Sequence, residues 1–348
     1  MAMRDKRRLV WSTRYSIHRD PVRVVEPDGL AQIGFWRTCS AILAYWLDSA
    51  INLSDASLQM IDQKTSISIV GAGALGQALA LGIHRAGRNI ETIVSRSRER
   101  GGQLAEAVEA ELLPSCQGHS PRIVILCVPD DVISATAGEL DCSPDSIVVH
   151  CAGSRGLDVL ESCTSENVHT GSIHPVMVLA RGGRGPEAMH GATAAIEGDH
   201  VSEPWLHQLA CDLGMRPVCI PPERRALYHL SAALVGGLMT GLLAASADLW
   251  KLLELDRSTA VEALAPMVRE AGLNFQKLGV PDVVMGPAAR GDIGTIRMHL
   301  NELRTHAPHL LPLYRELALL SIPYAVERSQ LDEQSAKDVR RALEFNED

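Results

Sequence analysis

The chain has 348 residues, a length that suits two domains better than one. Its formal net charge is −9, and an acidic chain is a poor candidate for nucleic-acid binding, which depends on clustered basic side chains. Hydrophobic residues make up 46% of the sequence, which supplies a packed core and argues against a disordered chain. The 8 cysteines form no Cys-x-x-Cys pair, so we expect no disulfide framework, no metal site and a cytoplasmic location.

Residues 1–59 differ from the rest of the chain because they are basic overall and rich in aromatic side chains. No apolar segment follows the basic stretch 4–8, so a secretory signal is unsupported. The apolar stretch Ala41–Leu47 is too short to cross a membrane. We expect residues 1–59 to be a poorly ordered extension, or one that does not belong to the native chain, which would then start at Met60.

A strand followed by a glycine-rich turn opens the first domain. Residues 66–70 are apolar and β-branched, which predicts a buried parallel strand. The next segment has the G-x-G-x-x-G pattern, and a helix is expected over residues 77–86. Glycines at these positions allow the tight turn, the approach of a pyrophosphate and close helix packing. The sequence therefore predicts a dinucleotide site that contains Gly71, Ala72, Gly73, Ala74, Leu75 and Gly76.

The end of the second predicted strand, residues 90–94, indicates which dinucleotide binds. An NAD site places a carboxylate there to bind the ribose hydroxyls. This chain instead has Ser95, Arg96, Ser97 and Arg98, whose guanidinium and hydroxyl groups suit a 2′-phosphate. We therefore expect NADP; the alternative for this segment is a solvated surface loop.

Further strands are predicted over residues 122–128, 146–150, 193–196 and 217–220. Val128 and Pro129 end one of them, where the nicotinamide end of the cofactor would lie. Asp130 and Asp131 follow, and helix capping is the favoured role for their carboxylates. The alternation of strands and helices predicts an α/β domain with a doubly wound sheet over residues 60–220.

Residues 221–348 lack strand signals and predict an all-α domain. Helices are expected over residues 224–252, 256–278, 292–305, 309–328 and 331–345. Leu230–Ala247 contains no charged residue, but its many small residues favour a buried central helix over a membrane span. Its small-residue face would allow close helix contact within the subunit or across a dimer.

The most polar, glycine-rich passage of this domain covers residues 286–299. Arg290 precedes a predicted helix and could bind an anion, while Asp292 could cap that helix. Thr295 and His299 are four residues apart and therefore share one helix face. A capped loop beside a surface histidine is the structural alternative.

Together these motifs resemble the Rossmann-like proteins that carry domain of unknown function 2520. The resemblance covers roughly residues 66–345 and rests on Gly71-Ala-Gly-Ala-Leu-Gly76, Val128-Pro-Asp-Asp131, His150-Cys-Ala-Gly153, Gly171-Ser-Ile-His-Pro175, Tyr228-His229 and Gly286-Pro-Ala-Ala-Arg-Gly-Asp292. These proteins belong to the wider clan of pyrroline-5-carboxylate reductase, ketopantoate reductase and the 6-phosphogluconate and β-hydroxyacid dehydrogenases. The resemblance implies an NADP-binding domain, a helical C-terminal domain and a homodimer, but no particular substrate.

The resemblance also indicates how the site would work. Ser172 and His174 are expected on a loop at the carboxyl edge of the sheet, facing the nicotinamide, with Tyr228 and His229 at the start of the long helix. A histidine with a near-neutral pKa suits proton donation. Arg290 would clamp an anionic part of the substrate, and Asp292, Thr295 and His299 would orient it or complete a relay.

The leading hypothesis is an NADP-dependent oxidoreductase that acts on a small carbonyl, imine or hydroxy acid. Relatives tend to have Ser-Asn where this chain has Gly236-Gly237, and this departure motivates a second hypothesis, an NADP-binding sensor without turnover. A third is an interaction protein tethered through residues 1–59.

Overall fold

A computed structural model describes residues 65–164, 167–179 and 185–344. These residues belong to one compact unit, Gln63–Asp348. The predicted extension, residues 1–59, and the proposed start at Met60 lie outside the described residues.

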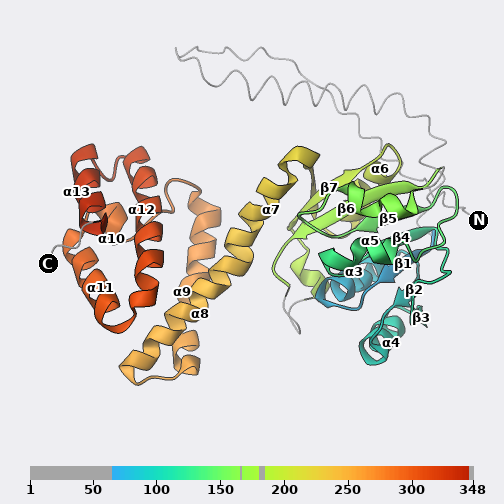
Figure 1. The fold of residues 1–348 in the computed structure, drawn as a ribbon, viewed down its shortest axis with the longest axis horizontal. Helices are drawn as coiled ribbons and strands as arrows, with labels where there is room; N and C mark the ends of the chain where they lie inside the picture. The colour runs from blue at the N-terminus through green and yellow to red at the C-terminus, as the bar shows by residue number, and fades with distance from the viewer. Residues whose placement is uncertain (1–64, 165–166, 180–184, 345–348) are drawn as a thin grey trace, which may run out of the picture. The chain divides into compact units, whose positions relative to one another are not determined.

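The first part of the described chain is built on an eight-stranded sheet with the strand order β3-β2-β1-β4-β5-β6-β7-β8 (Figure 1). All neighbouring strands are parallel except β6 and β7, which are antiparallel. This arrangement confirms the predicted α/β fold class. The strands are β1 (Ile67–Val70), β2 (Ile90–Val94), β3 (Glu111–Leu113), β4 (Ile123–Leu126), β5 (Ile147–His150), β6 (His169–Val176), β7 (Thr193–Gly198) and β8 (Arg216–Cys219).

The central strands β1, β4 and β5 are buried along their whole length, as their continuous apolar sequences predict. The helices of this part are α3 (Ala74–Arg85), α4 (Arg98–Ala107), α5 (Ile133–Ala137) and α6 (Ser202–Asp212), with short 3₁₀ turns η1 (Asp130–Val132), η2 (Leu157–Cys163) and η3 (Gly185–Ala188). Side chains of β4, β5 and α5 form a core that includes Val124, Leu126, Val148 and, from α5, Ile133. This core gives the carboxyl edge of the sheet a rigid support.

Strand β6 corrects one prediction. Ser172 and His174 lie within this strand, not on a loop. β6 pairs with β5 only as far as Ser172, which lies opposite His150, and then continues beside β7 to Val176. The antiparallel partner supplies hydrogen bonds beyond the point where β5 ends, so the strand extends past the parallel part of the sheet.

The second part of the described chain is helical. Its first segment runs through η4 (Pro222–Arg224), α7 (Arg225–Ala233), η5 (Leu234–Leu238), α8 (Met239–Leu249) and η6 (Trp250–Leu253), and α9 (Arg257–Leu278) follows. The turn η5 is a π-helix and contains the Gly236-Gly237 pair. The remaining elements are α10 (Pro287–Arg290), α11 (Ile293–His306), η7 (Pro308–Leu310), α12 (Leu311–Glu327) and α13 (Glu333–Glu344).

The segment Leu230–Ala247 is not the buried central helix that its composition predicts. Ala247 is buried, but Leu230, Leu234 and Leu238 are each more than half exposed. The apolar core of the helical part instead lies between α10, α11, α12 and α13, among side chains such as Ile296, Leu300, Ile322, Val339 and Leu343. Composition predicted an apolar helix correctly, but it could not show that the chain's own helices leave this one uncovered.

Candidate active site

The glycine-rich turn between β1 and α3 forms one wall of a cavity of about 650 Å³ at the carboxyl ends of β1, β2 and β4. Gly71 has a φ of +109°, and a Cβ at this position would collide with the carbonyl oxygen of Cys127. A Cβ at Gly76 would collide with the carbonyl oxygen of Gly71. Gly73 lines the cavity and has open space beside its Cα. The turn therefore needs glycine for two close packing contacts and leaves the backbone of Gly73 accessible to a ligand.

Eight of the residues expected to bind the cofactor line this cavity. They are Gly71, Ala72, Gly73, Ser95, Arg96, Ser97, Val128 and Pro129. Ala74, Leu75, Gly76 and Arg98 are not among the lining residues. The first three belong to helix α3 and its packing against the sheet, and Arg98 lies at the start of α4.

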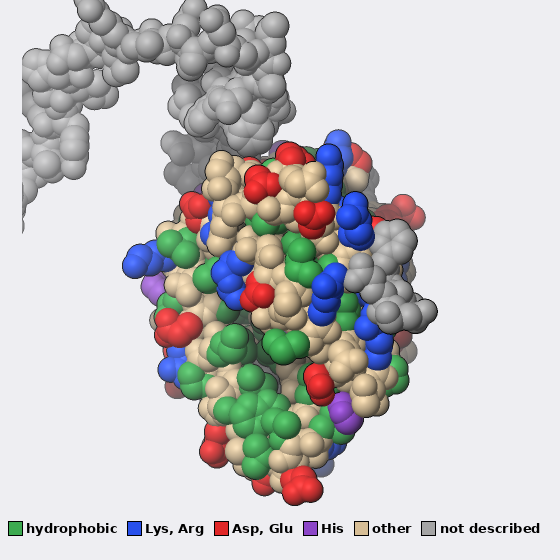
Figure 2. All heavy atoms as spheres, turned by 90° about the vertical axis from the view of Figure 1, so that its left-hand side faces the viewer, with side chains coloured by type: hydrophobic (Ala, Val, Ile, Leu, Met, Phe, Trp, Pro, Cys, Tyr) green, Lys and Arg blue, Asp and Glu red, His purple; other side chains and the backbone are tan. Residues whose placement is uncertain are grey.

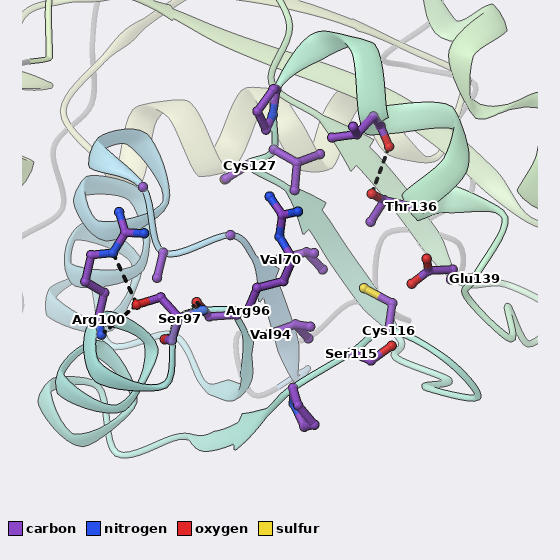
Figure 3. A pocket seen from close by; sticks show the side chains of 18 of the residues that line it. Val70, Val94, Arg96, Ser97, Arg100, Ser115, Cys116, Cys127, Thr136 and Glu139 are labelled. Atoms are coloured by element: carbon purple, nitrogen blue, oxygen red, sulfur yellow. Dashed lines mark hydrogen bonds between the residues drawn. The ribbon is translucent and has the colours of Figure 1, made fainter.

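Arg100 takes the place on the cavity wall that the sequence suggested for Arg98. The Ser97 hydroxyl caps α4 by accepting a hydrogen bond from the Arg100 backbone nitrogen at 3.4 Å, and it also accepts one from Arg100 Nε at 3.3 Å. Figure 3 shows Arg96 reaching over the cavity and Arg100 beside Ser97. Because α4 begins at residue 98, Arg100 is turned about 200° around the helix axis from Arg98. The helical register that decides between the two could have been predicted from the Ser97 cap.

The far side of the cavity is formed by residues that the motifs did not indicate. Thr136 and Glu139 lie at and beyond the end of α5, and Ser115 and Cys116 follow β3. Burial, with a smaller contribution from Glu139, raises the pKa of the Cys116 thiol to about 11. Cys116 is therefore an uncharged wall of the cavity at neutral pH.

A second group of side chains lies where β6 extends past β5. His174 Nδ1 is 2.8 Å from the phenolic oxygen of Tyr228, and the His174 and His229 rings are 5.8 Å apart between centroids. Gly153, in the loop after β5, packs against both histidines: a Cβ there would lie 2.6 Å from Cδ2 of His229 and 2.8 Å from Nε2 of His174. The structure thus brings His174, Tyr228 and His229 together, as three of the sequence-based site residues.

Ser172 belongs to this group through a residue that sequence reasoning missed. Arg225, the first residue of α7, is only 2% exposed. Its guanidinium donates hydrogen bonds to the Ser172 hydroxyl at 2.6 Å, to Glu197 Oε2 at 2.6 Å and to the carbonyl oxygen of Ala152 at 3.0 Å. Arg225 stands three residues before Tyr228, so it lies one helical turn below it, but nothing in the sequence marks it as buried.

Burial sets the protonation of this group. The pKa of His174 is lowered to about 4, first by burial and then by the nearby His229 and Arg225, while Asp130 opposes the change. Burial raises the pKa of the Tyr228 hydroxyl to about 12, against the effect of Arg225. Burial also raises the pKa of Glu197, and Arg225 partly offsets it. At neutral pH His174 is uncharged and Tyr228 is protonated, which differs from the near-neutral pKa expected for the histidine.

Asp130 and His150 both contact the loop after β5. Asp130 makes no capping hydrogen bond at the start of η1; its carboxylate accepts a hydrogen bond from the Ser154 hydroxyl at 3.2 Å. His150 is fully buried, accepts a hydrogen bond from the Ala152 backbone nitrogen and donates to the Gly156 carbonyl oxygen. Its pKa is lowered to about 4 by burial and by Arg225. Both side chains hold the loop that carries Gly153.

The polar residues near α11 form a separate cluster. Asp292 caps the helix, as predicted, by accepting hydrogen bonds from the Thr295 backbone nitrogen at 3.0 Å and the Thr295 hydroxyl at 2.7 Å. These bonds lower the pKa of Asp292, with a smaller contribution from Arg290. His299 Nδ1 is 3.0 Å from the hydroxyl of Tyr314, and Arg290 is exposed. His174 is hydrogen-bonded to Tyr228, whereas His299 is hydrogen-bonded to Tyr314. Within the described part of the chain, the predicted site residues therefore form two groups.

No group of three or more His, Cys, Asp or Glu side chains in the described residues could hold a metal ion.

Comparison with known proteins adds two family matches. Residues 66–153 match the family model of NADP oxidoreductases described as coenzyme F420-dependent, and residues 192–320 match the Domain of unknown function (DUF2520). The resemblance inferred from the motifs is thereby confirmed. The first match supports classification of the chain as an oxidoreductase, without naming its substrate. No curated protein matches the sequence significantly.

Several solved structures share the fold. A protein from Bacteroides fragilis described as a candidate NADP oxidoreductase is 24% identical, covers 74% of this chain and 98% of its own, and has a TM-score of 0.64. The protein TM1727 from Thermotoga maritima is 24% identical, with coverages of 76% and 99% and a TM-score of 0.62. A 1-pyrroline-5-carboxylate reductase from Streptococcus pyogenes is 17% identical, with coverages of 77% and 99% and a TM-score of 0.53. These identities establish a shared fold.

Proposed function

We propose that this protein is an NADP-dependent reductase or dehydrogenase that acts on a small carbonyl, imine or hydroxy-acid substrate. The observation that carries the proposal is the position of the Tyr228–His174 hydrogen bond, which lies beyond the end of β5 on the same sheet edge as the glycine-lined cavity. In doubly wound sheets this edge is where cofactors and substrates bind. The Tyr228–His174 pair and the cavity therefore share one edge of the sheet.

The cavity suits NADP. The crowded turn at Gly71 and Gly76 leaves the Gly73 backbone open to a pyrophosphate, and the N-terminus of α3 offers unpaired N–H groups. Arg96 and Arg100 supply two guanidinium groups at the end of β2, where an NAD site has a carboxylate. We assign these two arginines to the 2′-phosphate, and Val128 and Pro129 to the nicotinamide side. When bound, the cofactor supplies or accepts the hydride.

The protein's own part in the reaction is to move one proton. In this proposal Tyr228 donates its hydroxyl hydrogen to Nδ1 of His174, and the neutral ring then carries its own hydrogen on Nε2. As the substrate carbon gains a hydride, its oxygen or nitrogen takes the Nε2 hydrogen, and the Tyr228 proton moves to Nδ1. The imidazole stays uncharged throughout, and the phenolate regains a proton from water. The reverse sequence serves oxidation.

The anionic part of the substrate is assigned to the cluster around α11. Arg290 is an exposed cation beside Asp292, and the Asp292–Thr295 hydrogen bonds fix the start of the helix that carries His299. An exposed guanidinium at the end of a short helix can clamp a carboxylate or phosphate with two hydrogen bonds. In this proposal Arg290 binds the substrate, and Asp292 and His299 orient it.

A homodimer is the assembly we propose. Leu234, Val235 and Leu238 on η5 are each more than half exposed, as are Met267 and Phe275 on α9. Figure 2 shows further hydrophobic side chains on the outer face of the helical part. Exposed apolar side chains in this number are typical of obligate interfaces, and a second copy presents the same side chains.

The same helical segment, Pro222–Leu253, is long and apolar enough by composition to cross a membrane, with a mean hydropathy of 1.7 and 6% of its most apolar window buried. Arg225, at its start, is buried in an ion pair with the sheet. We therefore assign the segment to a protein interface.

Light scattering of the detergent-free protein is expected to report a dimer, and Leu234→Glu with Leu238→Glu is expected to shift it toward monomer. Recovery only in detergent, with flotation on liposomes, would contradict this assignment. The cytoplasmic location remains a prediction.

The experiment that tests the function is a turnover assay with NADPH and a panel of 2-keto acids, cyclic imines and, in reverse, hydroxy acids. Micromolar NADPH binding with NADPH oxidation on at least one member supports the proposal. The Gly236-Gly237 pair favours a second candidate, because it leaves the π-turn η5 without polar side chains that could hold a substrate. Tight NADPH binding without turnover on any member would favour this sensor function.

A further inference from the structure

A buried arginine next to the proposed relay has a role that the proton transfer itself does not explain. Arg225 contacts three separate parts of the sheet domain: the loop after β5 at Ala152, strand β6 at Ser172 and strand β7 at Glu197. It does so from the first residue of α7, the helix that carries Tyr228 and His229. One side chain thus connects the helix to two strands and one loop near the histidine pair.

The cost of burying this cation indicates a role other than stability. A guanidinium loses several kcal/mol of hydration when it is buried, and its ion pair with Glu197 returns only part of that loss. Arg225 also leaves its Nε without a hydrogen-bond partner among the described residues. An apolar side chain would fill the same space without these losses. We therefore attribute the buried guanidinium, with its several N–H donors in one plane, to the positioning of the site residues around it.

The charges around His174 define what this cation does. Four ionisable groups face the His174 ring: Tyr228, His229 and Arg225 on α7, and Asp130 on η1. Asp130 favours the imidazolium, while His229 and Arg225 oppose it. Arg225 is the permanent cation of this set, so it opposes the imidazolium at every pH.

We propose that Arg225 is a positioning residue of this site: it locks the start of α7 to the loop after β5, so that Tyr228 and Gly153 hold the His174 ring. Its guanidinium also adds, after burial and His229, to the lowering of the His174 pKa. The proposal rests on the function assigned to the Tyr228–His174 pair. Arg225 itself is too deeply buried to contact a substrate. Its effect passes through His174 and the loop that carries Ala152 and Gly153.

The test compares two variants. Arg225→Gln removes the charge but keeps hydrogen-bonding capacity, whereas Arg225→Lys keeps the charge but loses the planar set of guanidinium N–H donors. Arg224→Gln, at the exposed neighbouring position, is the matched control. The titration midpoint of His174 is followed by NMR of ring-labelled histidine in the full chain. We expect Arg225→Gln to raise the midpoint by about one pH unit, and Arg225→Lys and Arg224→Gln to leave it within about 0.3 unit. An unchanged midpoint in folded Arg225→Gln would overturn the electrostatic role.

The locking role has its own measurements. Arg225→Lys is expected to increase hydrogen exchange in residues 151–156 and to lower kcat about tenfold, with NADPH affinity unchanged. If Arg225→Lys shows wild-type hydrogen exchange in that loop, the locking role is overturned. This measurement does not depend on Arg225→Gln being able to fold. Absence of turnover by the unsubstituted protein would contradict the proposed function only, because the NMR and exchange measurements need no substrate.

Discussion

His174 and Tyr228 are 54 residues apart in sequence, yet Nδ1 of the histidine is 2.8 Å from the hydroxyl oxygen of the tyrosine. The contact exists because β6 extends beyond the end of its parallel neighbour β5 and reaches the first turn of α7. Their rings meet edge to face, with centroids 5.8 Å apart and an angle of 86°. Two fixed elements therefore hold both ends of a short hydrogen bond.

The relay predicts that both partners are needed for turnover. His174→Ala is expected to lower kcat about 100-fold and Tyr228→Phe at least tenfold, because positioned proton transfer contributes roughly 10²–10⁴-fold to rate. Steady-state kinetics and NADPH titration by fluorescence check the result, and NADPH affinity is expected to stay within about twofold. Tyr324→Phe, at a partly exposed site on α12, is the control. Equal losses of kcat and NADPH affinity would place the pair in the cofactor site.

The depressed pKa values of His174 and His150 predict the pH dependence. Both are about 4 in the folded chain, against 6.5 for an ordinary histidine, so the unfolded chain binds more protons between these values. The contribution of each neutral histidine to the free energy of unfolding is therefore complete above about pH 6.5. It is lost as the pH falls toward 4, by on the order of 3 kcal/mol for each residue.

Urea unfolding from pH 4 to pH 8 measures this effect. His150→Gln is expected to reduce the slope below pH 6.5, whereas His306→Gln, on an exposed histidine, is expected to leave it unchanged. The kcat profile is expected to stay flat from about pH 6 to pH 8 and to fall on the acid side near the His174 pKa. A bell centred on pH 6.5 would contradict a neutral His174.

The cavity predicts which arginines distinguish NADPH from NADH. Arg96→Ala combined with Arg100→Ala is expected to weaken NADPH binding about 100-fold and NADH binding only slightly, because charge-assisted hydrogen bonds contribute about 1.5–3 kcal/mol each. Arg98→Ala, outside the cavity wall, is the matched control and is expected to change neither affinity. A larger effect of Arg98→Ala than of Arg100→Ala would mean that the first turn of α4 is rotated in the complex.

Gly153 predicts a steric effect that is confined to the histidines. Gly153→Ala places a methyl group within 2.8 Å of both the His174 and His229 rings, so the rings must move. We expect kcat to fall at least tenfold while NADPH binding is retained. Gly272→Ala, on α9 where a Cβ meets nothing within 4 Å, is expected to raise stability by about 0.5–1 kcal/mol without affecting kcat. Unchanged kcat for Gly153→Ala would exclude the ring positions from the reaction.

Substitution of Arg290 is expected to change the KM for the substrate but not the affinity for NADPH. Arg290→Ala is expected to raise KM at least tenfold for an anionic substrate, with NADPH affinity intact, and Arg297→Ala on the exposed side of α11 serves as a comparison. Because the Arg290 cluster is separate from His174 within one chain, we expect mixing of Arg290→Ala and His174→Ala chains to restore part of the activity. No recovery in mixed dimers would show that both clusters act from the same chain.

Most of the nucleotide-binding half was predictable from local sequence patterns. Apolar β-branched strands such as Ile67–Val70 are recognisable because burial on both faces requires them, and the glycines that follow are required by contacts with the neighbouring backbone. The Ser97 cap sets the register of α4 and hence decides in favour of Arg100 over Arg98. Local signals of this kind depend on residues that are close in the chain.

The sequence by itself determined the class of the fold, the position of the glycine turn and the Asp292 cap, because each follows from the backbone conformation of a few consecutive residues. Only the tertiary structure decided that Ser172 and His174 lie on a strand, that Leu230–Ala247 is exposed and that Arg225 is buried. These outcomes depend on partners distant in sequence: β7 extends β6, and Glu197 and Ser172 receive a guanidinium from α7. Burial and charge at such contacts set the pKa of His174, which no local pattern encodes.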